Sequence, residues 1–266
     1  MSFYGTSFSV NGISCTQYGL MLYDFGSTTQ GNSKFASVEI SEDRLLQRDE
    51  SLFYGVRYTD PLELTLVFGA GEYSGGHKEP LDRLEIEAIS SWLRGEGKYQ
   101  IFRIDQPDLA GIYYRGIVTD LEVLEVGMMP WAFKCQVKCD SPYAHTDPIT
   151  YQFEISGSLK TSVYSRSASL HPYFPVMNVT ITSGDSFSIV NHSDHDRQFM
   201  LSGLPTASGT IQIDGSRGII LSSSGLNLYP YFNWNFPRLI RGNNDLTIAG
   251  SGLLSLTCAF PADVGG

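Results

Sequence analysis

Residues 131–139 form the most regular stretch of this chain and constrain its fold most strongly. Large side chains alternate with small or polar ones, which is the period of two of a β-strand with one buried face. The inward-facing set is Trp131, Phe133, Cys135, Val137 and Cys139. Asp140-Ser141-Pro142 then ends the strand, because proline lacks the N–H that a sheet requires. Since charge and element type also change here, we predict a boundary between two domains, residues 1–145 and 146–266.

Charge is distributed unevenly between the two predicted domains. Residues 1–145 contain 12 Lys and Arg against 20 Asp and Glu, and residues 146–266 contain 6 against 8, which gives formal charges of −8 and −2. An acidic chain without a basic stripe binds nucleic acid poorly, because neutralisation of phosphates drives that affinity. Such a chain can still provide a surface along which DNA slides.

The first domain is predicted to be mainly β with one helix, an α+β module. Asn11-Gly12 is a strong signal for a two-residue hairpin turn. Residues 79–94 carry the helix pattern, with Pro80 in the first turn and Gly95 at the C-terminal end. The apolar stripe predicted for this helix is Leu81, Leu84, Ala88, Ile89, Trp92 and Leu93. The strands are expected over 35–40, 62–68, 98–104, 112–124 and 131–139.

The second domain has the pattern of a β-sandwich. Short strands separated by Gly, Asn, Asp and Ser turns recur along it, which is typical of that architecture. Residues 146–170 are polar and weakly patterned, and no helix is predicted. The expected strands are 176–182, 186–191, 198–202, 210–213, 218–221, 231–236, 245–249 and 253–260.

The four cysteines indicate neither a disulfide framework nor a zinc site. Cys135 and Cys139 share a strand face but lie roughly 13 Å apart at strand rise, which is too far for a disulfide. Pairing of Cys15 with Cys258 stays open, and buried free thiols are the favoured state. A zinc site, which requires closely spaced pairs of Cys or His, is not predicted.

Targeting and membrane signals are also missing from the sequence. It has no apolar run long enough for a membrane span, and its start lacks the basic and apolar regions of a secretion signal. We therefore expect no membrane partner and synthesis in a cytoplasm.

Two segments contain residues of the kinds found in cofactor or metal sites. The segment 69–75 is glycine-rich, but it lacks the glycine spacing of a dinucleotide site and the lysine of a P-loop. The segment 192–196 gathers two histidines and two aspartates, yet Asn, Asp and Ser also cluster in ordinary turns. A plain connection is favoured for both, so no cofactor and no metal are predicted.

A third segment, 229–236, is rich in aromatic residues. Alternation sends Phe232, Trp234 and Phe236 to the core. The other row forms a candidate recognition surface that could stack on a sugar. Its members are Tyr229, Tyr231, Asn233 and Asn235.

Catalytic residues are not predicted. The sequence has no Gly-x-Ser-x-Gly elbow and no cysteine flanked by histidine. The acidic pairs Glu42-Asp43 and Asp49-Glu50 lie beside Arg44 and Arg48 on an expected surface. An enzyme that degrades cell-wall glycan is the minority alternative.

Several segments resemble one protein family. Cys139-Asp140-Ser141-Pro142-Tyr143-Ala144, after a mostly β module with one helix, resembles the distal tail protein (Dit) of long-tailed bacteriophages. Gly12-Ile13 followed by Tyr18-Gly19-Leu20 is similar to the start of that family. The segments 187–191, 213–214, 236–239, 242–244 and 256–260 are similar, in order, to its galectin-like domain.

The resemblance implies a structural role. It implies a split β-barrel module that closes into a hexameric ring, with galectin-like β-sandwiches outside it. Such a ring joins the tail tube protein to the tail-associated protein of the virion tail tip, docks receptor-binding proteins, and lets DNA pass without specific binding. Assembly would take place in the cytoplasm of the bacterial host. Residues 26–34 and exposed strand edges are candidate contacts between neighbours. The alternative is a carbohydrate-binding protein that grips host cell-wall glycan through the C-terminal sandwich.

Overall fold

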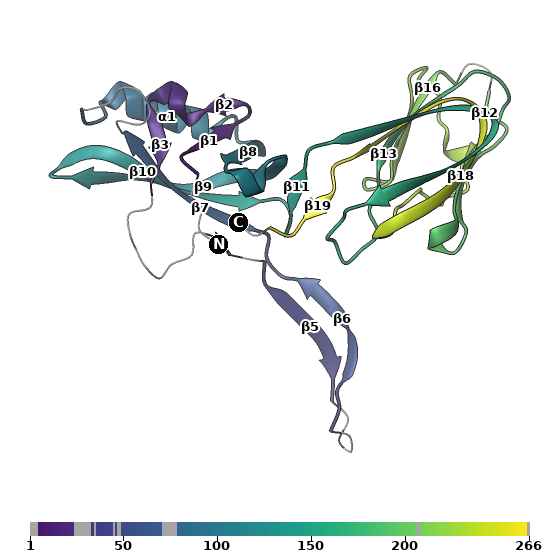
Figure 1. The fold of residues 1–266 in the computed structure, drawn as a ribbon, viewed down its shortest axis with the longest axis horizontal. Helices are drawn as coiled ribbons and strands as arrows, with labels where there is room; N and C mark the ends of the chain where they lie inside the picture. Colours follow the sequence, from purple (N-terminus) through teal and green to yellow (C-terminus); the bar gives the residue numbers. More distant parts are fainter. Residues whose placement is uncertain are drawn as a thin grey trace. The chain divides into compact units, whose positions relative to one another are not determined.

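The computed structural model describes residues 5–23, 33–34, 36–44, 46, 49–70, 79–205 and 208–264 of the 266-residue chain. The chain divides into two compact units, one of Met1–His145 with Asp263–Gly266 and one of Thr146–Ala262. Strands dominate both units, and the described residues contain one α-helix (Figure 1). The predicted fold class, mainly β with a helix-bearing first module and a following β-sandwich, is confirmed.

The first unit is a curved antiparallel sheet that nearly closes on itself. The N–H of Leu22 donates to the carbonyl of Thr6, the residue before the strand Ser7–Val10, at 3.0 Å. This bond joins the last strand of the order to the second. The result is a split β-barrel. Its strand order is β2 (Ile13–Ser14), β1 (Ser7–Val10), β8 (Gln100–Asp105), β9 (Ile112–Val126), β10 (Met129–Cys139), β7 (Glu63–Ala70) and β3 (Leu20–Leu22), with β4 (Ser33–Lys34) also paired to β7.

The predicted hairpin turn at Asn11-Gly12 is present between β1 and β2. Asn11 and Gly12 have φ of 51° and 83°, and positive φ at both central residues defines a type I′ turn. Asn11 also anchors the turn to β8, because its N–H donates to the Ile101 carbonyl and its Oδ1 accepts from the Ile101 N–H. This contact sets the register at one end of the sheet.

Alternating strand faces fill the barrel core. Leu64, Leu66 and Phe68 of β7 are at most 1% exposed, and the inward side chains of β10 from Phe133 to Cys139 are buried as predicted. The Phe68 ring lies 4.9 Å from that of Phe8 and 5.5 Å from that of Phe133. Burial of each such side chain contributes about 1.5–3 kcal/mol.

Helix α1 (Arg83–Arg94) begins later than the predicted range of 79–94. Asp82 is its N-cap in a reciprocal capping box with Glu85, both bonds being 2.8 Å long. This cap, rather than Pro80, sets the start of the helix. Its inward side chains are Ile86, Ile89, Trp92 and Leu93.

The face that the helix buries is narrower than the predicted apolar stripe. Leu84 is 74% exposed and Ala88 is exposed as well, so their predicted places in the apolar stripe are wrong. Leu84 and Ala88 lie outside the helix face on which Ile89 packs against the barrel core. Trp92, which was placed correctly, stacks at 5.7 Å on Phe8 and at 4.8 Å on Tyr18.

A separate two-stranded hairpin belongs to the first unit. It consists of β5 (Val38–Asp43) and β6 (Leu52–Tyr58), which pair with each other and extend away from the barrel sheet (Figure 1). Every residue of β5 is exposed. The predicted strand over 35–40 overlaps β5, whereas β6 was not predicted, although its aromatic and β-branched content is typical of a strand.

The second unit is a β-sandwich whose two layers share a pair of long strands. β12 (Ile149–Ser165) and β18 (Gly242–Cys258) pair over 17 residues each. β18 then pairs with β14 (Phe187–Asn191) along its first half and with β13 (Val176–Ile181) along its second half. The layers continue through β15 (Arg197–Leu201) on one side and through β16 (Thr210–Asp214) and β17 (Ile219–Ser222) on the other.

Two predictions for this unit are wrong, and one of its strands was not predicted. Most of the weakly patterned segment 146–170 forms β12, and the two strands predicted at 245–249 and 253–260 are one strand, β18. The alternation in β18 is interrupted at Gly250 and Gly252, where φ is 139° and 152° and the strand passes from one layer to the other. The predicted strand at 231–236 is absent, and a 3₁₀ turn, η5 (Tyr229–Tyr231), leads into this segment.

The chain passes from the first unit to the second through β11 (Ala144–Thr146) and returns after β19 (Pro261–Ala262). All four cysteines are buried and free, so Cys15 and Cys258 do not pair. Burial raises the pKa of the Cys135, Cys139 and Cys258 thiols to about 12. At neutral pH these side chains are uncharged core residues.

Candidate functional site

The segment Cys139–Ala144, which lies at the predicted domain boundary and is called the joint below, is held by hydrogen bonds to its backbone. The N–H of Cys139 donates to the Leu62 carbonyl at 2.9 Å, and the N–H of Leu62 donates to the Ser141 carbonyl at 3.0 Å. Ser141 Oγ accepts from the Tyr143 N–H at 3.1 Å. These bonds fix the direction in which the chain leaves β10.

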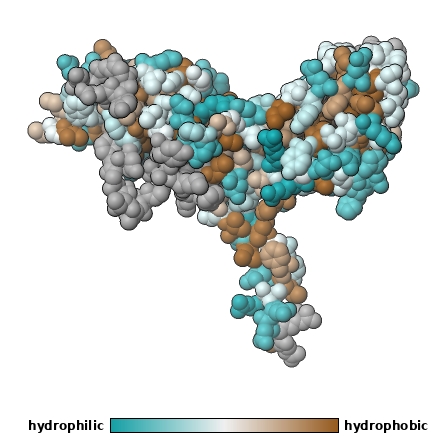
Figure 2. Space-filling view, viewed as in Figure 1, coloured by the Kyte–Doolittle hydropathy of each residue, from teal (hydrophilic) through white to brown (hydrophobic). Residues whose placement is uncertain are grey.

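One face of the β5–β6 hairpin is apolar. The register places Val38 opposite Tyr58 and Ile40 opposite Val56, so the four side chains share a face. Val38 and Ile40 are 47% and 56% exposed, and apolar residues are visible along the hairpin in Figure 2. We call these four residues the hairpin surface.

The opposite face of the hairpin is polar. Arg57 Nη2 lies 2.6 Å from Glu39 Oε2, and Ser41, the next residue on this face, lies opposite Gly55. Beyond a register shift at Ser41/Glu42, Phe53 and Tyr54 add further exposed aromatic surface. A two-stranded hairpin is marginal by itself in water, and an exposed apolar face rimmed by polar groups marks an interaction site.

A buried polar network joins three of the segments that carry the family resemblance. Its centre is Asn244, whose side chain is fully buried. The Asn244 Oδ1 accepts from the Ile240 N–H at 2.8 Å and from Asn191 Nδ2 at 2.9 Å. The Asn244 Nδ2 donates to the carbonyls of Ile240 and Gly242. Asn191 Nδ2 also donates to the Arg238 carbonyl at 3.0 Å.

An ion pair extends this network. Arg238 binds Asp194, the last residue of η4 (His192–Asp194), through Nε–Oδ2 and Nη2–Oδ1 contacts of 2.7 and 3.0 Å. The hydrogen bond from Arg238 holds the pKa of the Asp194 carboxyl below its usual value. Asn191, Arg238 and Asn244 are distant in sequence, so only the fold brings them together.

The His192–Asp196 segment, considered as an ion site, uses its side chains internally. The His192 Nδ1 lies 2.6 Å from Asp196 Oδ1, and its Nε2 lies 2.8 Å from Thr247 Oγ1. Within the described ranges, no group of three His, Cys, Asp or Glu is arranged to hold a metal ion. The imidazole therefore links the η4 turn to β18.

Two predicted segments lie outside the described residues. The first is residues 26–32, which belong to the segment predicted to contact a neighbouring copy. The second is residues 71–75, which are most of the glycine-rich segment. In the part of the chain that the structure covers, no helix has the length and apolar character needed to cross a membrane.

The aromatic segment 229–236 differs from its prediction. Phe232 is buried as expected, but Trp234 is 69% exposed, so its predicted place in the core is wrong. Asn233, predicted to face a ligand, pairs with the edge of β15 instead. Its Oδ1 accepts from the Met200 N–H and its Nδ2 donates to the Gln198 carbonyl. Because this segment is no strand, alternation cannot assign its faces.

Trp234 occupies the corner that follows Asn233. Its φ of 63° lies in the left-handed region, which costs roughly 1–3 kcal/mol for a residue other than glycine. The indole stacks on Tyr229, with ring centroids 5.7 Å apart. We call Trp234 and Tyr229 the aromatic platform. The flanking Asn233 and Asn235 are turn residues, and they are the sequence signal that the strand prediction overlooked.

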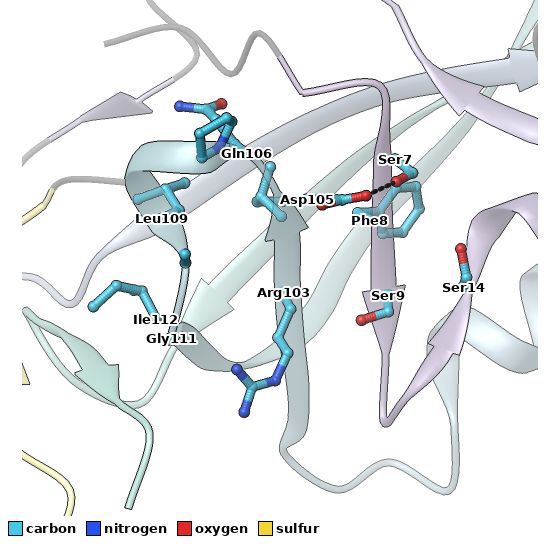
Figure 3. A pocket seen from close by; sticks show the side chains of 13 residues that line it. Ser7, Phe8, Ser9, Ser14, Arg103, Asp105, Gln106, Leu109, Gly111 and Ile112 are labelled. Atoms are coloured by element: carbon cyan, nitrogen blue, oxygen red, sulfur yellow. Dashed lines mark hydrogen bonds between the residues drawn. The ribbon is translucent and has the colours of Figure 1, made fainter.

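A cavity of about 470 Å³ lies in the first unit beside β1, β8 and η3 (Pro107–Leu109) (Figure 3). Its charged side chains are engaged locally. The Asp105 carboxylate accepts from Ser7 Oγ at 2.9 Å, and the Arg103 guanidinium lies 5.4 Å from the centre of the Tyr113 ring. The residues that line it include no histidine or cysteine, so the lining offers no familiar pair of nucleophile and base.

The fold is similar to that of a solved phage protein. The crystal structure of Dit from phage SPP1, described as a paradigm of the hub adsorption apparatus in phages that infect Gram-positive bacteria, aligns with a TM-score of 0.68. The alignment covers 96% of this chain and 98% of that one, at 14% identity. Two structures of the phage p2 baseplate in its activated conformation, with Ca and with Sr, align at TM-scores of 0.46 and 0.48. They cover 94% and 95% of this chain and 97% of each of those, at 11% and 10% identity.

Comparison of the sequence gives the family. None of the curated proteins matches the chain in sequence. The family described as phage tail protein N-terminal domain matches residues 3–141, and the one described as phage tail C-terminal domain matches residues 143–258. The two matches span both units. The chain therefore belongs to the phage tail protein family and has a Dit-like fold.

Proposed function

We propose that this protein is the structural hub of a phage tail tip. Six copies close into a ring that joins the tail tube protein to the tail-associated protein of the tip. Membership of the phage tail protein family and a Dit-like fold over both units support this role. The virion tail is then the site of function, after assembly in the host cytoplasm.

The hairpin surface is the observation that carries the proposal. It is an apolar face on a hairpin whose strands, within one copy, contact mainly each other. The Tyr58 ring, at the base of this face, also lies 5.2 Å from the Tyr143 ring. A neighbouring copy would remove this face from water, and a head-to-tail contact of this kind generates a closed ring when its rotation closes. We therefore assign the hairpin surface to the contact between neighbours.

The two units would act as separate domains in this hub. Each has its own apolar core, one around Phe68 and one around Ile248. The first domain, residues 1–145, would form the ring, and the second, residues 146–266, would dock receptor-binding proteins outside it. The joint at Cys139–Ala144 would set the path of the chain between them.

The charge of the first domain suits a passage for DNA. With a net charge of −10 per chain, six copies carry a formal charge of six times −10, or −60. Acidic walls repel phosphates, so DNA would pass without sticking. The proposed hub has no catalytic role. Release of soluble fragments from bacterial cell walls by the purified protein would instead favour the enzyme alternative.

A charge placed on the hairpin surface should prevent ring formation. We expect negative-stain microscopy of the wild-type chain to show six-fold rings, and Ile40→Asp to abolish them, because the contact would bury an unpaired carboxylate. Ser41→Asp is the matched control, since it adds the same charge on the other face of β5 and should leave the rings intact. Rings that form equally well in both variants would contradict the assignment.

A further inference from the structure

We propose that the aromatic platform of the second unit, Trp234 stacked on Tyr229, binds a neutral glycan. This binding function goes beyond the structural role of the hub and does not depend on it. The platform combines a large exposed indole, a backbone conformation that such a residue rarely adopts, and a surrounding segment, residues 218–237, without charged side chains.

The backbone around Trp234 directs the indole outward. The N–H of Asn233 donates to the Met200 carbonyl at 3.1 Å, and both ends of its side-chain amide bond to the β15 backbone at Gln198 and Met200. The Asn235 N–H then donates to Asn233 Oδ1 at 3.3 Å. The chain must turn between Asn233 and Asn235, and Trp234 takes the corner with φ of 63°. Non-glycine residues held in this region cluster at ligand clamps and active sites.

Tyr229 makes the platform rigid. Its hydroxyl donates to the Gly218 carbonyl at 3.1 Å and accepts from the Ile220 N–H at 3.3 Å. Its own N–H donates to Asn227 Oδ1 at 3.2 Å. The ring is thus fixed at both ends, and the indole stacks on it at an interplanar angle of 26°. Tyr229 supports one part of the indole while 69% of Trp234 stays open to solvent. A preformed surface of this kind loses little entropy on binding.

The chemistry of the surroundings favours a neutral sugar. Residues 218–237 contain no charged side chain, and the exposed residues near the platform in sequence include Asn227, Pro230 and Asn235. The C–H face of a sugar ring is apolar and suits an aromatic face, while amide side chains donate to and accept from hydroxyls. A charged ligand would find no opposite charge in this segment. Binding hot spots for proteins are enriched in arginine as well as Trp and Tyr. Two arginines near this segment, Arg197 and Arg238, are engaged with the Phe236 carbonyl and with Asp194.

Trp234→Asn tests the proposal without disturbing the turn. Asparagine tolerates positive φ better than bulky residues do, so the variant removes the indole and keeps the corner. The probes are neutral oligosaccharides of glucose, galactose, mannose and N-acetylglucosamine on an array, together with acidic and sulfated oligosaccharides. We expect the wild-type chain to retain neutral oligosaccharides and Trp234→Asn to bind them at least about tenfold more weakly, the equivalent of losing one good contact.

Two internal controls make the result specific. Tyr164 of β12 is 61% exposed in the same unit, so Tyr164→Ala removes an equally accessible aromatic ring and should leave binding unchanged. Trp92 and Trp131 pack against the core of the first unit, so a blue shift of tryptophan emission on adding a neutral sugar should come from Trp234. That shift should be absent in Trp234→Asn, while its thermal unfolding temperature is no lower than that of the wild type.

Four outcomes would overturn the proposal: retention of no neutral oligosaccharide, retention of acidic ones alone, equal binding by Trp234→Asn, or capture of a tail protein through Trp234 without any glycan. The last would make the platform a protein-docking site. Ring assembly is measured separately on the same variant and should be unaffected. Failure of glycan binding therefore leaves the hub intact, and failure of ring assembly leaves the glycan site intact.

Discussion

Gly252→Ala should destabilise the second unit by about 4 kcal/mol, near the upper end for one substitution. A Cβ at Gly252 would lie 2.0 Å from the Thr180 carbonyl oxygen and 3.0 Å from the Ile181 Cα. Both contacts are to the β13 backbone, which cannot move aside without breaking its pairing with β18. The φ of 152° adds strain for alanine. Scanning calorimetry, with hydrogen exchange of the peptides from β13 and β18, measures the effect.

Gly157→Ala is the matched control for this prediction. Gly157 lies opposite Gly250 on the partner strand β12 and also has positive φ, 84°, but a Cβ there meets nothing within 4 Å. The expected cost is therefore the conformational one alone, about 1–2 kcal/mol. If Gly252→Ala were as stable as Gly157→Ala, the close approach of β13 to β18 at Gly252 would not contribute to the stability of this unit.

Asn244→Leu should destabilise the second unit by a similar amount, about 4 kcal/mol. Leucine has nearly the same shape, but it leaves the Ile240 N–H, the Ile240 carbonyl and Asn191 Nδ2 without their bonds to Asn244. Each buried group that loses its partner costs about 1–3 kcal/mol, and the costs overlap within one network. Urea unfolding of the full chain, followed by far-ultraviolet circular dichroism, measures the change.

The neighbouring residue provides the comparison. Asn243 is exposed, and its side chain donates to Asp245 at 2.7 Å on the surface. Asn243→Leu should change stability by no more than about 0.5 kcal/mol. If Asn244→Leu unfolds at the same urea concentration as Asn243→Leu, the buried network is not what holds the three segments together.

The sequence predicted strands well where one face of a strand is buried against a single core. β10 is the clearest case, because Phe133, Cys135 and Val137 point into the barrel and nothing interrupts their alternation. The Asn11-Gly12 turn could also be predicted, because its conformation depends on these two residues alone. The start of α1 was misplaced because a capping box at Asp82 prevailed over the proline signal.

Strands with changing surroundings were harder to predict. β18 borders β14 and then β13, and the glycines at this change interrupt the pattern. β12 has only two fully buried apolar side chains, Ile155 and Val163, so its alternation is faint in the sequence.

The candidate sites depended still more on tertiary structure. Asn191, Arg238 and Asn244 belong to separate segments of the sequence, and no local pattern indicates that their side chains meet. Trp234 was assigned to the core because alternation presupposes a strand, and the side chain of Asn233 replaces that strand with a corner. The hairpin surface contradicts the usual burial of apolar residues, so its exposure could not be read from hydrophobicity alone.

The native mass of the purified chain tests the proposed hub most directly. Six copies of 29.4 kDa give six times that mass, about 176 kDa. We expect native mass spectrometry to show this species as the main one, persisting on dilution as a closed ring does. A single species at 29.4 kDa at every concentration at which the protein stays soluble would contradict the ring, and with it the role of the hairpin surface.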